Sequence, residues 1–296
     1  MIRTTKLVIL GVMLGLVATP AASQTYYNWM SPEIKDAWSQ GYKGQGTTIT
    51  VIDDFRSNNG YYGNFGDGLK FLRHGDWTYK EIGMLAPSAS MKQDDFSSQL
   101  QVRLATKGLN ILNMSYGMYA SGSYTLSQIG WGAQESSIIQ YAKYGSAVAV
   151  KAAGNDAVAV TGTNAQGNKD FLNLALVGAP SAIFVGALDR NGTTTAPASL
   201  ASYSNFAGSD TAVQKNFLVV GVRGDLTGLY GTSFAAPVVS AYSGVLGSKF
   251  TKATPVQITN QLLNTARQDT LVNYSATIYG RGEASLSRAL APVSIK

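Results

Sequence analysis

One serine in the chain stands where a nucleophile could be mounted. Residues 228–244 read GLYGTSFAAPVVSAYSG, so Ser233 directly precedes an apolar segment that predicts a helix. A serine there can cap the helix, because its side-chain oxygen accepts free backbone N–H groups of the first turn. The same position suits a catalytic serine, since the helix dipole and those N–H groups favour developing negative charge. The segment alone favours the cap.

His74 is the only histidine, which narrows the chemistry. A single histidine is usually structural and cannot build a histidine-cluster metal site, but it can act as a general base. A serine mechanism that uses an imidazole must therefore use His74, and activity should fall at low pH as the imidazole gains a proton. Asp53 could orient the imidazole, and the amide of Asn155 could donate to the oxyanion.

The elements that would position these residues alternate along the chain. Nearly continuous apolar runs predict strands buried on both faces of a parallel sheet, at 47–53, 109–115, 146–153, 182–188 and 217–222. Helices are predicted at 97–107, 127–144, 234–249 and 255–267, the last with Thr254 as cap. The alternation indicates a doubly wound α/β fold, in which ligands bind outside the carboxyl ends of the strands. Three predicted strands end there in polar or glycine residues, at 53–54, 115–117 and 154–156.

The N-terminus predicts export. Arg3 and Lys6 precede an apolar run at 7–17, and small residues at 21–23 form a cleavage pattern. A membrane anchor is the competing reading, but the run is short for a bilayer and Pro20 follows it. We therefore expect residues 1–23 to be a signal peptide and residues 24–296 to form one domain, secreted or periplasmic, with no recognisable prodomain and no stable membrane insertion.

Composition excludes several classes of function. The chain has 296 residues, no cysteine and a formal net charge of +6, which falls to +4 without residues 1–23. The absence of cysteine excludes thiol catalysis and cysteine-ligated metals. The basic residues form no run that would follow a nucleic-acid backbone, so we expect no nucleic-acid partner. We expect a monomer that needs no metal or cofactor.

The chain order Asp53, His74, Ser233 discriminates among serine hydrolases. An α/β-hydrolase runs Ser, Asp, His and carries Gly-x-Ser-x-Gly, whereas the nearest segment here is NMSYG, at 113–117. The chymotrypsin order, His, Asp, Ser on an all-β scaffold, also fails. An esterase or lipase is thereby disfavoured.

Seven segments resemble, in order, those of the subtilisin family of serine peptidases. They are GYKGQGTTITVIDD (41–54), RHGDWTYKEIGMLAPSA (73–89), LNMSYG (112–117), VKAAGND (150–156), FVGALDRNG with ASYSNFAG (184–208), YGTSFAAPVVSA (230–241) and YGRGEASLSRAL (279–290). The resemblance implies a three-layer α/β fold and a serine endopeptidase that acts on polypeptides.

The resemblance also implies roles for individual residues. Asp53, His74 and Ser233 would be the triad, with Asn155 in the oxyanion hole. Substrate would bind along two segments whose residues are Ser115, Tyr116 and Gly117 in one, and Ala152, Ala153 and Gly154 in the other.

Some residues depart from the family pattern. Asp54 and Phe55 follow Asp53 where Ser or Thr and Gly are usual, and Asp76-Trp77 replaces the usual second histidine. We expect Asp54 to face solvent. These departures keep open the alternative that the chain is an inactive or weakly active member that binds peptides or proteins.

Overall fold

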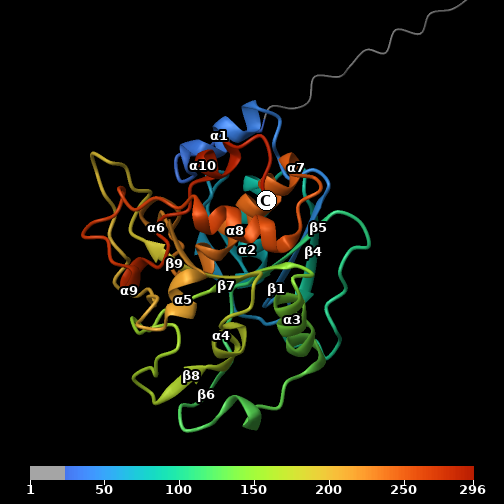
Figure 1. Cartoon of the computed structure of the whole chain (residues 1–296), viewed down its shortest axis with the longest axis vertical. Helices are drawn as coiled ribbons and strands as arrows, with labels where there is room; N and C mark the ends of the chain where they lie inside the picture. The colour runs from blue at the N-terminus through green and yellow to red at the C-terminus, as the bar shows by residue number, and fades with distance from the viewer. Residues whose placement is uncertain (1–23) are drawn as a thin grey trace, which may run out of the picture.

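A six-stranded parallel sheet forms the centre of the computed structural model, which describes residues 24–296. Its strand order is β10-β9-β7-β5-β1-β4, and every neighbouring pair is parallel. Helices lie on both sides of the sheet (Figure 1). The predicted α/β fold with a mostly parallel central sheet is confirmed. The predicted signal peptide, residues 1–23, lies outside the described residues.

The strands and helices have the following bounds. The central strands are β1 (Thr47–Asp53), β4 (Ser90–Asp95), β5 (Leu109–Met114), β7 (Val148–Ala152), β9 (Ala182–Leu188) and β10 (Phe217–Gly221). Two antiparallel pairs flank them, β2 (Tyr61–Gly63) with β3 (Lys70–Leu72), and β6 (Tyr119–Ser121) with β8 (Asn168–Asp170). The helices are α1 (Pro32–Ser39), α2 (His74–Leu85), α3 (Ala133–Tyr144), α4 (Phe171–Leu176), α5 (Thr211–Lys215), α6 (Gly224–Thr227), α7 (Ala236–Lys249), α8 (Pro255–Asn264), α9 (Ala276–Tyr279) and α10 (Leu286–Leu290), with 3₁₀ turns at Leu126–Gln128 and Thr232–Phe234.

The central strands are apolar on both faces because each face carries a hydrophobic core. Side chains of α1, α2, α7, α8 and α10 cover one face, and those of α3 and α4 cover the other. All seven residues of β1 and of β9 are buried. The sequence pattern of uninterrupted apolar runs follows from this double burial.

α7 is the helix that follows Ser233, and it is buried on nearly every side. It reads APVVSAYSGVLGSK, and its small residues let it approach the sheet closely. A Cβ added at Gly247 would lie 2.6 Å from Thr47 and 2.7 Å from Leu109. Pro237 lies in its first turn, where a proline leaves no intrahelical hydrogen bond unmade.

The structure corrects several predicted elements. Residues 97–107 form no helix: the amide of Val102 donates to Ser137 Oγ, and Ala105 exchanges two hydrogen bonds with the Asn110 side chain. The helix expected at 127–144 begins only at Ala133, after Gly130 and Gly132, and the helix expected at 255–267 ends at Asn264. β4 was missed, since its sequence SMKQDD is polar, as an edge strand can be.

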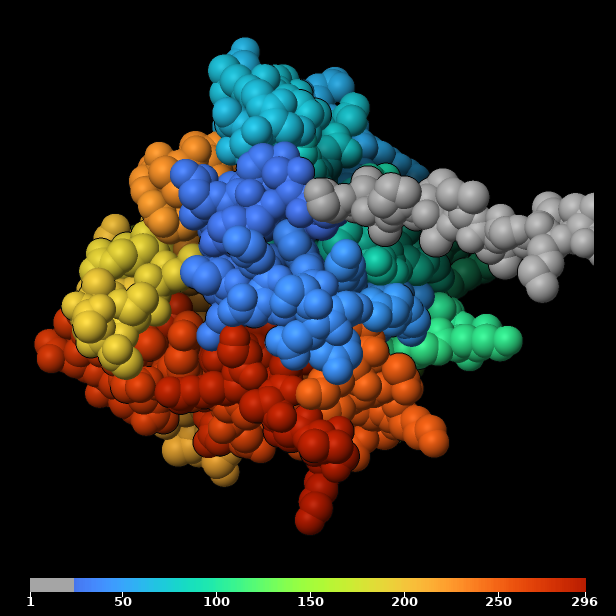
Figure 2. Space-filling model, turned by 90° about the horizontal axis from the view of Figure 1, so that it is seen from above, coloured from blue at the N-terminus to red at the C-terminus, as the bar shows by residue number. Residues whose placement is uncertain are grey.

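The two ends of the described chain lie side by side. The Glu33 carboxylate on α1 accepts hydrogen bonds from the Ser285 hydroxyl, at 3.0 Å, and from the Leu286 amide, at 2.6 Å, so it caps α10. Figure 2 shows α1, in blue, against the red C-terminal segment. Within residues 24–296, no helix is both long enough and apolar enough to cross a membrane.

Candidate active site

Asp53 and His74 form a hydrogen-bonded pair at the carboxyl end of β1. Oδ1 of Asp53 lies 2.6 Å from Nδ1 of His74, the first residue of α2. Oδ2 accepts from the hydroxyl of Thr78, at 2.9 Å, one turn further along α2. The aspartate side chain is only 2% exposed and the imidazole 20%, so both carboxylate oxygens are held while His74 still reaches solvent. A buried carboxylate bonded to Nδ1 leaves Nε2 as the nitrogen free to accept a proton.

The carboxylate of Asp54 does not bond to this pair, although the backbone amide of Asp54 donates to Oδ1 of Asp53, at 2.7 Å. The Asp54 carboxylate folds back over the following turn and accepts hydrogen bonds from the amide of Ser57, at 2.9 Å, and from the Ser57 hydroxyl. Burial raises the pKa of Asp54, but the bonds from Ser57 and Arg56 outweigh it, so that the pKa is lowered. The carboxylate is therefore an ionised turn former, partly buried rather than fully exposed.

Ser233 lies in the 3₁₀ turn Thr232–Phe234, three residues ahead of α7. Its hydroxyl makes no capping hydrogen bond, so the cap reading is wrong. Instead the hydroxyl donates to the carbonyl of Ser115, at 3.1 Å, while the Ser115 hydroxyl donates to the carbonyl of Ser233, at 2.9 Å. The imidazole of His74 lies beside this turn, with its centroid 5.8 Å from that of the Phe234 ring. Among the described residues, no hydrogen bond joins Ser233 to His74.

Asn155 is fixed beside Ser233, and within residues 24–296 no group accepts a hydrogen bond from its NH₂. Its Oδ1 accepts from the amide of Thr232, at 2.8 Å, and from the Thr232 hydroxyl, at 3.1 Å. A backbone N–H can only donate, which settles the orientation of the side chain and leaves Nδ2 as a donor. Gly231 adopts φ +119°, and a Cβ there would lie 3.3 Å from Nδ2. This arrangement can stabilise negative charge next to Ser233.

The two predicted substrate segments extend from neighbouring strands. Met114 of β5 is paired with Lys151 of β7, so 115–117 and 152–154 leave the sheet at the same edge. Ala153 is buried, and its carbonyl accepts hydrogen bonds from the side-chain amides of Asn173 and Asn205. These two bonds hold the segment 152–154 in place. The Tyr116 side chain points inward, where burial raises its pKa.

Sequence reasoning missed the residues that support the site. Thr78 could have been found, because a residue four positions after His74 on a helix lies on the same face of that helix. Asn113 offered no such signal. It is fully buried, accepts from the Ser240 hydroxyl of α7, at 2.9 Å, and donates to the Ser115 hydroxyl, at 3.1 Å. This chain of hydrogen bonds ties α7 and β5 to the backbone of Ser233.

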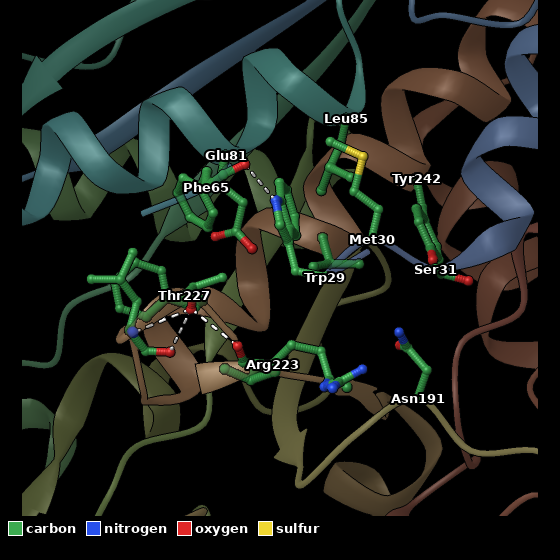
Figure 3. Close-up of a pocket in the computed structure, with 15 residues that line it drawn as sticks. Trp29, Met30, Ser31, Phe65, Glu81, Leu85, Asn191, Arg223, Thr227 and Tyr242 are labelled. Carbon is green, nitrogen blue, oxygen red and sulfur yellow. Dashed lines mark hydrogen bonds between the residues drawn. The ribbon is translucent and has the colours of Figure 1, made fainter. Parts of the chain in front are cut away.

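An unpartnered carboxyl group lies two turns after His74 on α2. Glu81 is 3% exposed, and no described group bonds to its Oε2. It points into a cavity of about 20 Å³, lined by residues that include Trp29, Phe65 and Phe234 (Figure 3). Burial raises the pKa of Glu81 well above its usual value. The nearby Arg223 is bonded to Asp225, at 2.7 Å.

Replacing Glu81 by Gln is expected to remove a pH-dependent loss of stability. The folded wild type holds the Glu81 proton to higher pH than the unfolded chain does, so its stability falls as pH rises past the usual glutamate range. The free energies of unfolding in urea should be similar for both proteins at pH 4.5 and should differ by about 1 kcal/mol at pH 8, in favour of the variant. Asp269→Asn, at a 53% exposed carboxylate, is the control. An equal difference at both pH values would contradict the assignment.

No group of three or more His, Asp or Glu side chains in residues 24–296 is placed to hold a metal ion. The four side chains of Asp53, His74, Ser233 and Asn155 come from β1, α2, the turn before α7 and the segment after β7.

Comparison with known proteins identifies the family and the fold of the chain. The family described as Peptidase S8, the subtilase family, matches over residues 73–282, which include His74, Asn155 and Ser233 but not Asp53. Among solved structures, the prenylagaramide maturation protease PagA is similar, with a TM-score of 0.56 and 18% identity over 88% of this chain and 98% of that one. A lanthipeptide protease is similar too, with a TM-score of 0.55 and 18% identity over 87% of this chain and 92% of that one.

At such identities the two structures show the shared fold alone. No curated protein matches the chain. The family match covers most of the chain. The protein belongs to the subtilase family of peptidases.

Proposed function

We propose that the chain is an exported serine endopeptidase that cleaves polypeptides through an acyl-enzyme on Ser233. The observation that carries the proposal is the hydrogen-bonded Asp53–His74 pair, which lies beside a serine whose other neighbour is an amide donor with its NH₂ bonded to no group of residues 24–296. These are the four parts that acyl transfer by a serine requires.

The proposed first step forms the acyl-enzyme. Ser233 Oγ attacks the carbonyl carbon of the scissile bond, and its proton passes to Nε2 of His74. The oxyanion accepts hydrogen bonds from Asn155 Nδ2 and from the backbone N–H of Ser233. His74 then gives its proton to the leaving amine as the C–N bond breaks. Asp53 stabilises the imidazolium throughout.

Water completes the reaction by the reverse route. It attacks the ester carbon while His74 takes one of its protons, and the C–O bond to Ser233 breaks as that proton returns to Oγ. The product acid leaves and the free serine is restored.

Substrate itself can align the serine. The Ser115 carbonyl now accepts from the Ser233 hydroxyl. A substrate main-chain N–H that bonds to the same carbonyl would compete with the hydroxyl, which could then rotate toward Nε2 of His74. Catalytic hydrogen bonds often form only in the substrate complex.

Hydrolysis of internally quenched peptides by residues 24–296 tests the proposal. We expect cleavage inside the peptides, and loss of cleavage in Ser233→Ala. The bond from Ser233 to the Ser115 carbonyl is the observation that favours the alternative, a peptide-binding protein without turnover. Peptide binding with no product from the folded wild type would support that alternative and contradict the proposal.

Replacing Asn155 by Asp is expected to lower kcat by about 10²- to 10³-fold with little change in KM, a magnitude carried over from subtilisin, a member of the same family. The aspartate keeps an oxygen to accept from Thr232, so the fold is retained, while the amide donor is lost. Steady-state kinetics on one quenched peptide measure both constants. Asn260→Asp, at an exposed position on α8, is the control. Near wild-type kcat in Asn155→Asp would rule out the oxyanion role.

We also infer that residues 1–23 direct export and are then removed, on the grounds of their charge, apolar run and cleavage pattern. N-terminal sequencing of the exported protein is expected to begin at Gln24. A chain retaining residues 1–23 after export would contradict this.

A further inference from the structure

A tyrosine ring lies across the two segments proposed to bind substrate. Tyr119 follows the first segment by two residues, at the start of β6. A Cβ added at Gly117 would lie 2.6 Å from Cε2 of the Tyr119 ring, and one added at Gly154 would lie 3.5 Å from its hydroxyl oxygen. The ring thus rests on Gly117 and reaches toward Gly154. It is 47% exposed, so it covers the space between the segments from the solvent side.

The far end of this ring is tied to the second segment. The Tyr119 hydroxyl donates to Oδ2 of Asp156, at 3.1 Å, and the amide of Asp156 donates to the buried Asn205, at 2.9 Å. Burial and the carboxylates of Asp170 and Asp156 raise the pKa of Tyr119, so its hydroxyl remains a donor at neutral pH.

The backbone under the ring is also held. β6 pairs with β8, with Tyr119 opposite Asp170. The Met118 amide donates to Oδ1 of Asp170, at 3.0 Å, and the Phe171 amide donates to the Met118 carbonyl, at 2.8 Å. The ring can therefore leave its place by side-chain rotation more easily than by movement of the strand.

The space behind Gly117 is closed by a compensated ion pair. Oδ2 of Asp170 lies 2.9 Å from the position of a Cβ on Gly117, and 3.0 Å from Nζ of Lys151. Both side chains are nearly fully buried, and Nζ also donates to the carbonyl of Ala152, at 2.7 Å. Neither charge is left over to attract a charged substrate side chain, and uncovering either without its partner would be costly.

From these contacts we propose that Tyr119 sets the primary specificity of this peptidase, confining the residue before the scissile bond to a small uncharged side chain such as alanine. The inference rests on the proposed function. The Tyr119 ring occupies the space between Gly117 and Gly154 that a large substrate side chain would need. The buried Lys151–Asp170 ion pair prevents a substrate side chain from entering further behind Gly117.

The test is a set of tetrapeptide 4-nitroanilides that differ only in the last residue, Ala, Leu or Phe. For the wild type, kcat/KM for Ala should exceed that for Phe by about tenfold or more. Tyr119→Ala should raise the ratio of kcat/KM for Phe to kcat/KM for Ala by about tenfold or more. Tyr119→Phe, which keeps the ring but loses the bond to Asp156, should still prefer Ala.

Tyr144→Ala, at an 82% exposed tyrosine on α3, is the matched control and should keep the wild-type preference. Active-site titration with a fluorophosphonate normalises every rate. Enzyme that titrates but cleaves Ala and Phe substrates equally, or an unchanged ratio in Tyr119→Ala, would overturn the specificity proposal alone. Wild type that neither titrates nor cleaves would overturn the proposed function, and this inference with it.

Discussion

Replacing Ser233 by Ala is expected to lower kcat by about 10⁴- to 10⁶-fold, while the protein stays folded and still binds peptide. The upper figure is that measured for the corresponding change in subtilisin, a member of the same family. The hydroxyl supplies the only covalent bond that the substrate would form with the enzyme, so the loss falls on the chemical step. In the free protein that hydroxyl makes one hydrogen bond, to the Ser115 carbonyl, and its removal should cost about 1 kcal/mol of stability or less.

The measurement is steady-state hydrolysis of a quenched peptide, with thermal unfolding recorded for both proteins. Ser243→Ala is the matched control, since that serine is on α7 and bonds only to the Val239 carbonyl of its own helix. A rate within tenfold of wild type in Ser233→Ala would mean that the serine is not the nucleophile.

Asp53→Asn is expected to lower kcat by about 10⁴-fold. The substitution keeps the size of the side chain but removes the charge that stabilises the imidazolium, and the new amide can bond to Nδ1 only if His74 takes the wrong tautomer. The prediction matters because the family match begins at residue 73 and leaves Asp53 outside. Its assignment depends on the 2.6 Å contact with His74.

Asp54→Asn supplies the control for this prediction. That carboxylate is adjacent in sequence but is used by the turn at Ser57, so kcat should remain within about threefold of wild type. Kinetics of both variants at pH 8 decide the matter. An equal loss of kcat in Asp53→Asn and Asp54→Asn would contradict the assigned role of Asp53. It would show that kcat depends on the negative charge of both residues and not on the hydrogen bond to His74.

The sequence predicted the parallel sheet well because each buried strand leaves an uninterrupted apolar run. β1 and β9 begin and end where expected. β5 and β10 end one residue early, and β7 begins two residues later and ends one residue earlier than predicted. β4 escaped because an edge strand with side chains of mixed exposure need not be apolar. The helix expected at 97–107 does not form, because side chains outside the segment bind backbone amides that a helix would use itself. These side chains are those of Asn110, a few residues later, and of Ser137, far away in the sequence.

For the site too, the sequence predicted some features and not others. Asp53 and Asn155 were chosen at strand ends, His74 as the only histidine and Ser233 at a helix start, and their motifs resemble those of the subtilisin family. The structure places them near one another, although their roles stay predictions. The partner of the Ser233 hydroxyl could not be foreseen, because it depends on a contact between residues 118 apart in the chain. The position of Tyr119 over Gly117 likewise follows from the pairing of β6 with β8. The local sequence of either strand does not predict that pairing.

Mass spectrometry after reaction with a fluorophosphonate tests the central claim most directly. Residues 24–296 are treated with the reagent, the intact mass is measured, and the modified residue is located by peptide mapping. The proposed mechanism predicts one adduct per chain, on Ser233, that is absent from both Ser233→Ala and His74→Ala under the same conditions. No adduct on the folded wild type, or an adduct on another residue, would contradict the assignment of Ser233 as the nucleophile.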